Sequence, residues 1–403
     1  MKSFFEDQVE ELKSKDLLRI EKIVESDQGP VVKCQGKTVL NFSSNNYLGL
    51  ANHPRLKKAA IQAIERYGVG SGASRLITGT MSLHQELEKV LAGFKGCEAS
   101  LIFNSGYHAN IGVITALVDP NDVIFSDELN HASLIDGCRL SKASVMIYRH
   151  SDMRHLRELL KSHVEQKRKE KKQGVQISSK LLIVTDTVFS MDGDLCLLPA
   201  LMKLADDFDA QIFVDEAHAT GVFGEKSRGV VEHYGISSKK KNLIQMGTLG
   251  KALGSFGAYV CGPKAFCDFL KNKARTYVFT TALPPAVLAA TLEAIRLINQ
   301  DLSLKNQLWR NVEYFKRGLT QVIANSSYEL LKTDSPIFPI LVGSQSRTMD
   351  LSQKLFDEGI WIQGIRPPTV PDGTSRLRLT LMATHTKEHL DKCLVTLEKV
   401  LKL

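Results

Sequence analysis

The chain has no closely spaced pair of cysteines of the C-x-x-C type, although it contains seven cysteines among its 403 residues. They stand at positions 34, 97, 138, 196, 261, 267 and 393, so their number is odd and they are scattered. A disulfide framework or a zinc site would use paired cysteines at short spacings. We therefore expect reduced thiols, a cytoplasmic location and no bound metal.

Long apolar runs are also missing. No stretch approaches the roughly 18 apolar residues of a membrane-spanning helix. Residues 1–23 are charged and helix-patterned, and they lack the apolar core of a signal peptide. The sequence therefore argues against membrane insertion and secretion, and it shows no internal repeat or low-complexity tract.

The formal net charge is +8, but most Lys and Arg residues alternate with Asp and Glu. The exceptions are the runs 166–172 and 239–241. Either could bind nucleic acid, but no aromatic residue lies between their basic side chains, and both are typical of solvated loops. We expect the stretch from Lys167 to Lys172 to be a loop extension, and no nucleic-acid partner.

What the chain does contain is an alternation of short β-rich runs and helix-length amphipathic segments from Ala99 to Gly262. This order predicts an α/β domain with a mostly parallel sheet covered on both faces. We expect an N-terminal helix with short strands in residues 1–45, a large domain in 46–290 and a smaller α+β domain in 291–403. A long helical stretch from about Pro285 to Ile323 would lead into a second group of strands and helices.

Several predicted strands end in a polar residue followed by a turn, where open α/β sheets place their ligands. Lys251 follows one such strand within a glycine-rich turn, and an amine there could bind a carbonyl cofactor covalently. Asp215 ends the preceding strand, and His218 follows one turn later. A buried carboxylate needs a cationic partner, and the protonated ring nitrogen of pyridoxal phosphate is one.

Read alone, Asp215 to His218 could be the ATPase motif of helicases. No G-x-x-x-x-G-K-[ST] loop precedes it, so a nucleotide would have no phosphate cradle. The cofactor phosphate could instead bind at the turn Asn104 to Tyr107 and at Thr248. The glycine cluster 68–75 misses the dinucleotide spacing G-x-G-x-x-G, and we expect a flexible loop lining the site.

Taken together, these motifs resemble the α-oxoamine synthases, a family of fold-type I pyridoxal-phosphate enzymes, over nearly the whole chain. The motifs that carry the resemblance are Ser44 to Leu50, Asn130 to Ser133, Phe189 to Gly193, Asp215 to Gly221 and Gly247 to Gly254. The chain departs from many members at Asn46 and Glu216, where Asp is common, and at Asp186, where some carry Glu.

The resemblance implies a role for each candidate residue. Lys251 would hold the cofactor, Asp215 would pair with its ring nitrogen, His218 would contact its hydroxyl and His131 would stack on its face. The residues implied to line the cofactor are Ser105, Gly106, Tyr107, Ser190 and Thr248. Thr280 and Thr281 match a segment that reaches the phosphate of the neighbouring subunit, which implies a homodimer.

Arg378 aligns with the family arginine that holds the amino-acid carboxylate, with Asn45 nearby and Arg376 as its competitor. The family joins an amino acid to an acyl thioester with loss of carbon dioxide. The segment Ile365 to Pro371 is similar to that of members that use L-alanine and a pimeloyl thioester. The alternatives are a glycine C-acetyltransferase, which would use glycine and acetyl-CoA, and a non-catalytic scaffold or regulatory subunit. The sequence leaves open whether pimeloyl-CoA or a pimeloyl carrier protein is the acyl donor.

Overall fold

The structure is a computed structural model that describes residues 3–15, 17–173 and 179–402. The chain forms two compact units. The first comprises Met1–Asn52, Ser190–Asp194 and Ser303–Leu403, and the second comprises His53–Phe189 and Leu195–Leu302. The two ends of the chain therefore belong to one unit, a grouping that the linear division at residues 45 and 290 does not express.

The second unit is built on a seven-stranded sheet of order β3-β9-β8-β7-β6-β4-β5. Its strands are β3 (Ala99–Phe103), β4 (Val123–Asp127), β5 (Ser144–Tyr148), β6 (Leu181–Asp186), β7 (Gln211–Asp215), β8 (Leu243–Thr248) and β9 (Ala258–Gly262). Only β9 runs antiparallel to its neighbours, β3 and β8. The predicted mostly parallel sheet is thus confirmed.

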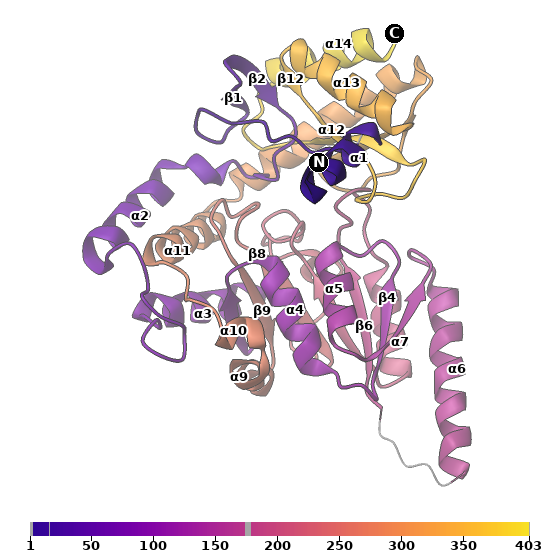
Figure 1. Ribbon diagram of the computed structural model, residues 1–403. Coiled ribbons are helices and arrows are strands. Elements are labelled where there is room, and N and C mark those ends of the chain that lie inside the picture. Colours follow the sequence, from indigo (N-terminus) through magenta and orange to yellow (C-terminus); the bar gives the residue numbers. More distant parts are fainter. Residues whose placement is uncertain (1–2, 16, 174–178, 403) are drawn as a thin grey trace. The chain divides into compact units, whose positions relative to one another are not determined.

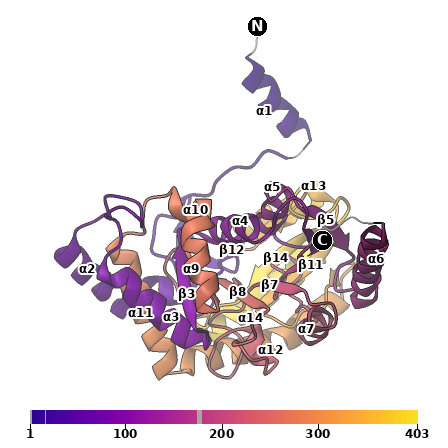
Figure 2. The same ribbon diagram turned by 90° about the horizontal axis from the view of Figure 1, so that it is seen from below.

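Helices cover both faces of this sheet (Figure 1). The helices of this unit are α2 (Pro54–Tyr67), α3 (Ser82–Lys95), α4 (Gly106–Leu117), α5 (Ala132–Leu140), α6 (Met153–Lys172), α7 (Leu198–Asp207), α8 (Val230–His233), α9 (Lys264–Lys273), α10 (Arg275–Val278) and α11 (Pro285–Gln300). In Figure 2, α4 and α5 lie on one side of the strands and α7 lies on the other. Apolar side chains of α4 and α5 pack with Leu101, Phe213 and Val260 of the sheet in one buried cluster.

The expectation of a loop from Lys167 to Lys172 is wrong, because these residues form the last part of α6. Lys, Arg, Glu and Gln all favour helices, and no Gly or Pro interrupts the segment before position 174. Hydrogen bonds from Gln166 and Lys167 to Glu170 also join successive turns. The buried side chains of Leu156 and Leu160 lie in the first half of the same helix.

The long helical stretch from Pro285 to Ile323 is two helices rather than one. α11 ends at Gln300, and α12 (Ser303–Ala324) begins in the other unit. Asp301 interrupts the helical backbone with φ −146° and ψ 119°, which is an extended conformation.

The first unit contains two small sheets, of order β1-β2-β12 and β10-β11-β14-β13. Their strands are β1 (Val31–Cys34), β2 (Lys37–Asn41), β10 (Glu329–Leu330), β11 (Ile337–Gly343), β12 (Ile360–Trp361), β13 (Gln363–Ile365) and β14 (Ser375–Thr380). Its helices are α1 (Phe4–Ser14), the short 3-10 helix η1 (Leu50–Asn52), α12, α13 (Gln345–Asp357) and α14 (Lys387–Leu401). Phe42 stacks on His385 with ring centroids 4.3 Å apart, so N-terminal and C-terminal residues share one core.

All seven cysteines are free. Within the part of the chain that the structure describes, no helix is long and apolar enough to cross a membrane.

Candidate active site

The predicted cofactor residues of the second unit collect along one edge of its sheet. Ser105 follows β3, His131 follows β4, Asp215 ends β7 and Thr248 ends β8. Because parallel strands share the direction of their carboxyl ends, these positions line the same edge, where open α/β sheets bind ligands. The alternation of strands and helices in the sequence is what places them together.

Asp215 is only 4% exposed, and both of its carboxylate oxygens accept hydrogen bonds. Oδ2 accepts from the amide of Asn110 on α4 at 2.8 Å, and Oδ1 accepts from the backbone N–H of Ala217 at 2.8 Å. Its carbonyl accepts from the hydroxyl of Thr187 at 2.9 Å. These neutral donors fix the orientation of the carboxylate without neutralising it, so it can still attract a cation.

A second carboxyl group lies beside it, because Asp186 of β6 is the register partner of Asp215. Burial raises the pKa of Asp186 well above its ordinary value, and the charge of Asp215 raises it further. Its Oδ2 accepts from the backbone N–H of His131 at 2.7 Å. Asp186 therefore holds the start of α5, where His131 is the N-terminal cap.

His131 leaves part of its surface open to solvent, as a residue that stacks on a ligand ring must. Its Nδ1 lies 2.7 Å from the hydroxyl of Ser133, which fixes the plane of the imidazole. Exclusion of water by surrounding atoms lowers the pKa of His131; the charge of Asp215 raises it and that of Lys251 lowers it. The lowered pKa favours a neutral imidazole near pH 7.

Lys251 lies half-buried in the turn after β8. Its charge lowers the pKa of both His131 and Asp186, so the amine lies near both groups. His218 is buried in the turn that follows β7. The four residues predicted to be catalytic, Lys251, His131, Asp215 and His218, therefore all belong to the same edge of one unit.

The N-terminus of α4 forms the candidate phosphate site. The Ser105 hydroxyl caps this helix by accepting from the N–H of His108 at 3.2 Å. A Cβ at Gly106 would lie 2.8 Å from the Cγ2 of Thr248, so the helix start and the end of β8 touch. Backbone N–H groups at a helix N-terminus and a nearby hydroxyl suit a phosphate. The hydroxyl of Tyr107 donates to Asp136 at 2.8 Å.

Thr280 and Thr281 lie beside this turn in the same chain. The Asn104 amide donates to the Thr280 hydroxyl at 3.0 Å and to the Thr281 carbonyl at 2.9 Å. Their expected contact with a neighbouring subunit's phosphate stays a prediction.

The first unit holds the predicted carboxylate-binding residues. The guanidinium of Arg378 donates to the carbonyl of Ser190 and to the Asn45 side-chain oxygen, the latter at 3.2 Å. Arg376 instead forms an ion pair with Asp192 at 2.5 Å. Among the described residues no carboxylate lies within ion-pair distance of Arg378, so of the two arginines Arg378 is the better placed to bind a carboxylate ligand.

Sequence reasoning missed one residue at this edge. Asn110 is fully buried in α4 and donates to both Asp215 and the Ser133 hydroxyl. The available signal was a lone amide within an otherwise apolar helical stretch. Asp186 was recognised as a strand end and as a departure from the family pattern, but its contact with His131 was not.

These residues fit pyridoxal phosphate by their chemistry. The lysine amine can bind its aldehyde, and the buried carboxyl group of Asp215 can pair with its ring nitrogen. The helix N-terminus at Ser105, with the hydroxyls of Ser105 and Thr248, can bind its phosphate. Among the described residues no group of three or more His, Cys, Asp or Glu side chains could hold a metal ion.

Residues 37–397 match the model of the aminotransferase class I and II family, and the chain belongs to that family. The fold is that of this class. Among its curated relatives, the 8-amino-7-oxononanoate synthase of Thermoanaerobacter pseudethanolicus is 48% identical over 397 residues, covering 98% of this chain and 96% of the relative. The enzyme of the same name from Geotalea daltonii is 48% identical over 398 residues, with 98% and 97% covered.

Solved structures of related enzymes have the same fold. A serine palmitoyltransferase from S. paucimobilis, whose structure contains PLP and myriocin, has a TM-score of 0.88 at 28% identity, covering 98% of this chain and 96% of that one. The 8-amino-7-oxononanoate synthase of Francisella tularensis has a TM-score of 0.73 at 30% identity, covering 90% and 97%. The fold class expected from the sequence is thereby confirmed.

Proposed function

We propose that this chain is a pyridoxal-phosphate-dependent acyltransferase that condenses L-alanine with a pimeloyl thioester. The products are 8-amino-7-oxononanoate, carbon dioxide and a free thiol, a reaction of biotin synthesis. The observation that carries the cofactor chemistry is the buried, oriented carboxylate of Asp215 on the sheet edge that also bears Lys251. The names of the relatives at 44–48% identity support the choice of substrates.

Pyridoxal phosphate, when bound, supplies an electron sink for the bond that breaks at the substrate Cα. Asp215 keeps a proton on the ring nitrogen by offering it a buried anion. His131 would stack on the ring face, and His218 would contact the ring hydroxyl. The helix start at Ser105 and the hydroxyl of Thr248 bind the phosphate.

Lys251 has two tasks in this scheme. Its amine would hold the cofactor in the resting enzyme, and the same amine, once free, would remove the proton from the alanine Cα. The Cα then bonds to the thioester carbonyl carbon and the carbon–sulfur bond breaks, releasing a thiolate that takes its proton from solvent to give the free thiol. Loss of the alanine carboxylate as carbon dioxide leaves an electron pair at Cα, and the Lys251 ammonium returns the proton there.

Arg378 binds the alanine carboxylate with the two-pronged geometry of a guanidinium, and Asn45 orients it. The guanidinium already contacts neutral oxygens only, so an incoming carboxylate does not have to displace an ion-pair partner.

Either pimeloyl-CoA or a pimeloyl carrier protein could donate the acyl group. Docking of an acidic carrier protein on Lys167 to Lys172 is disfavoured by the course of α6. Its 20 residues span about 30 Å, and it runs from the carboxyl edge of the sheet to the opposite edge (Figure 1). A carrier bound at the basic end would lie far from Lys251.

The active enzyme is a cytoplasmic homodimer in this proposal. Large apolar side chains are exposed on two segments that run side by side, namely Val69, Leu76 and Ile77 on one and Phe279 on the other. The segments are joined by the bridge between Ser74 and Thr281. Such an exposed apolar cluster is typical of a surface that a second protein covers, and a second copy would bring Thr280 and Thr281 to its neighbour.

A glycine C-acetyltransferase would use the same residues with glycine and acetyl-CoA, so only the substrates separate the two. Purified enzyme should change its visible spectrum with L-alanine and release thiol from pimeloyl-CoA. Turnover with glycine and acetyl-CoA alone would move the chain to the other branch. A protein that binds the cofactor but turns over neither pair would instead be a scaffold.

A further inference from the structure

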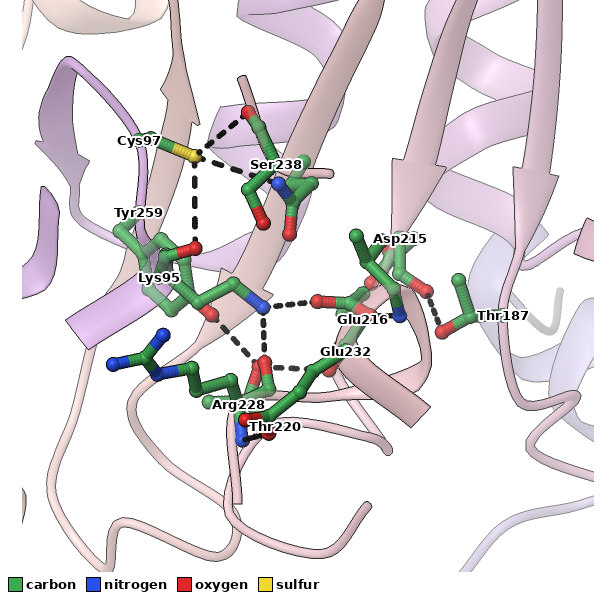
Figure 3. A network of polar contacts seen from close by, with 12 residues as sticks. Lys95, Cys97, Thr187, Asp215, Glu216, Thr220, Arg228, Glu232, Ser238 and Tyr259 are labelled. Carbon is green, nitrogen blue, oxygen red and sulfur yellow. Dashed lines mark hydrogen bonds and ion pairs between the residues drawn. The ribbon is translucent and has the colours of Figure 1, made fainter. Parts of the chain in front are cut away.

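Next to Asp215 lies a second charged group that the proposed chemistry does not use. Glu216 has a side chain that is 0% exposed, and it forms an ion pair with Lys95, whose side chain is 1% exposed (Figure 3). Lys95 is the last residue of α3, 121 positions away in the sequence. Burying two charges costs several kcal/mol for each ion, so a pair in this position needs compensating contacts.

Each member of the pair has a further hydrogen-bond partner. The Lys95 ammonium also donates to the carbonyl of Arg228, and Glu216 Oε1 accepts from the N–H of Val231 at 2.9 Å. Burial lowers the pKa of Lys95, but the neighbouring Glu216 carboxylate outweighs this effect and raises it overall. The Lys95 ammonium therefore stays charged near pH 7, and the pair ties α3 to the loop before α8.

The backbone of Glu216 anchors the turn that carries His218. Its N–H donates to the carbonyl of Met246 at 2.7 Å, which extends the pairing of β7 with β8. Its carbonyl accepts from the N–H groups of Ala219 and Thr220, each at 2.9 Å. The turn thus begins at a residue whose backbone and side chain are both held.

Successive residues of a strand point to opposite faces of the sheet. Asp215 is held from one face by Asn110, and Glu216 is held from the other by Lys95. Ala217, whose N–H donates to the Asp215 carboxylate, directly follows Glu216. A shift of Glu216 would therefore move both a donor to Asp215 and the turn that bears His218.

We propose that Lys95 and Glu216 are positioning residues that hold Asp215 and His218 in register with the ring of the cofactor. This inference rests on the proposed cofactor chemistry. We therefore predict that breaking the ion pair weakens cofactor binding more than an equally destabilising substitution elsewhere in the protein does.

The experiment compares Glu216→Gln, Lys95→Met and the double variant with the wild type. Two quantities are measured without any substrate: the dissociation constant of pyridoxal phosphate from a titration of the cofactor-free protein, and the free energy of unfolding of that protein in urea. Leu160→Ala is the control, because it opens a cavity in the core under α6, which packs on the edge strand β5 and not on β7 or β8.

We expect each single variant to raise the dissociation constant at least about tenfold and to shift the visible absorbance maximum of the bound cofactor. The double variant leaves no unpaired buried charge, so it should fold even if a single variant does not. It should recover stability but not affinity. Leu160→Ala should lose stability while its dissociation constant stays within about twofold of the wild type.

Two results overturn the inference: single variants that lose stability but bind the cofactor as the control does, or a double variant that recovers wild-type affinity together with stability. A wild-type protein that binds no pyridoxal phosphate would instead remove the proposed function, so the two failures are distinguishable.

Discussion

The carboxyl groups of Asp186 and Asp215 end adjacent strands, yet their partners differ. The carboxylate of Asp215 accepts from two donors, whereas that of Asp186 accepts from the N–H of His131 and has a negative charge nearby. Two adjacent buried carboxylates disfavour simultaneous ionisation. The proton is therefore expected on Asp186, whose pKa is raised well above its ordinary value.

Asp186→Asn should change how the stability of the cofactor-free protein depends on pH. The pKa of Asp186 is raised by folding, so above pH 3.8 the folded protein holds a proton that the unfolded chain has lost. Stability contributed by this group is lost as pH rises toward the folded pKa. The variant should escape this loss, by up to about 1.4 kcal/mol for each pH unit.

Urea unfolding at several pH values measures this effect. Asp350→Asn, which removes an exposed carboxylate on α13, serves as the control. If the stability of Asp186→Asn runs parallel to that of the wild type from pH 4 to 8, the assignment of the proton to Asp186 is wrong.

Lys251→Ala should abolish the visible absorbance of the lysine-bound cofactor and lower kcat by at least about 10³-fold, because the variant lacks the amine that moves the substrate proton. Lys264→Ala, at an exposed ion pair with Asp268, should leave both unchanged. Retained turnover in Lys251→Ala would exclude the proposed mechanism.

The candidate phosphate site depends on one secondary-structure element, the N-terminus of helix α4. Ser105 caps α4, and Gly106 lets the helix approach Thr248 more closely than any residue with a Cβ would allow. The close approach is a tertiary contact, because Gly106 and Thr248 belong to different strand–helix units.

Gly106→Ala should therefore separate the helix start from β8 and raise the cofactor dissociation constant about tenfold or more, as measured by titration. Gly93→Ala in α3 is the matched control, since a Cβ there meets no atom within 4 Å. That control should be neutral or stabilise the protein by about 0.5–1 kcal/mol. Equal cofactor affinity in both variants would argue against a phosphate site at this helix start.

For the whole molecule, the question is which surface a second copy covers. The exposed side chain of Phe279 stands directly before Thr280 and Thr281, on the segment joined to Ser74. We expect Thr280 and Thr281 to bind the cofactor phosphate of the neighbouring subunit. Because the apolar surface lies next to them, formation of the dimer and cofactor binding should depend on each other.

Phe279→Asp should give a monomer with weakened cofactor binding, because a charge placed in an apolar interface is costly to bury. Sedimentation velocity measures the first effect and cofactor titration the second. Phe269→Asp, at an exposed position on α9, is the control. A Phe279→Asp protein that remains dimeric would show that the interface lies elsewhere.

The sequence by itself determined the alternation of strands and helices, and with it the sheet edge on which Lys251, Asp215, His131 and Thr248 lie. Local periodicity and turn residues are sufficient for this, since each element reports its own pattern. Local reading failed at Lys167 to Lys172, where a basic composition was taken for a loop although the same residues favour a helix.

Only the tertiary structure decided the partners of the buried charges. Asn110 reaches Asp215 across 105 positions, and Lys95 reaches Glu216 across 121. The tertiary structure likewise decided that Asp192 forms an ion pair with Arg376, whereas Arg378 donates to neutral oxygens. Such pairs depend on which elements pack together and on which face of a strand each residue lies, and one sequence contains no local signal for either.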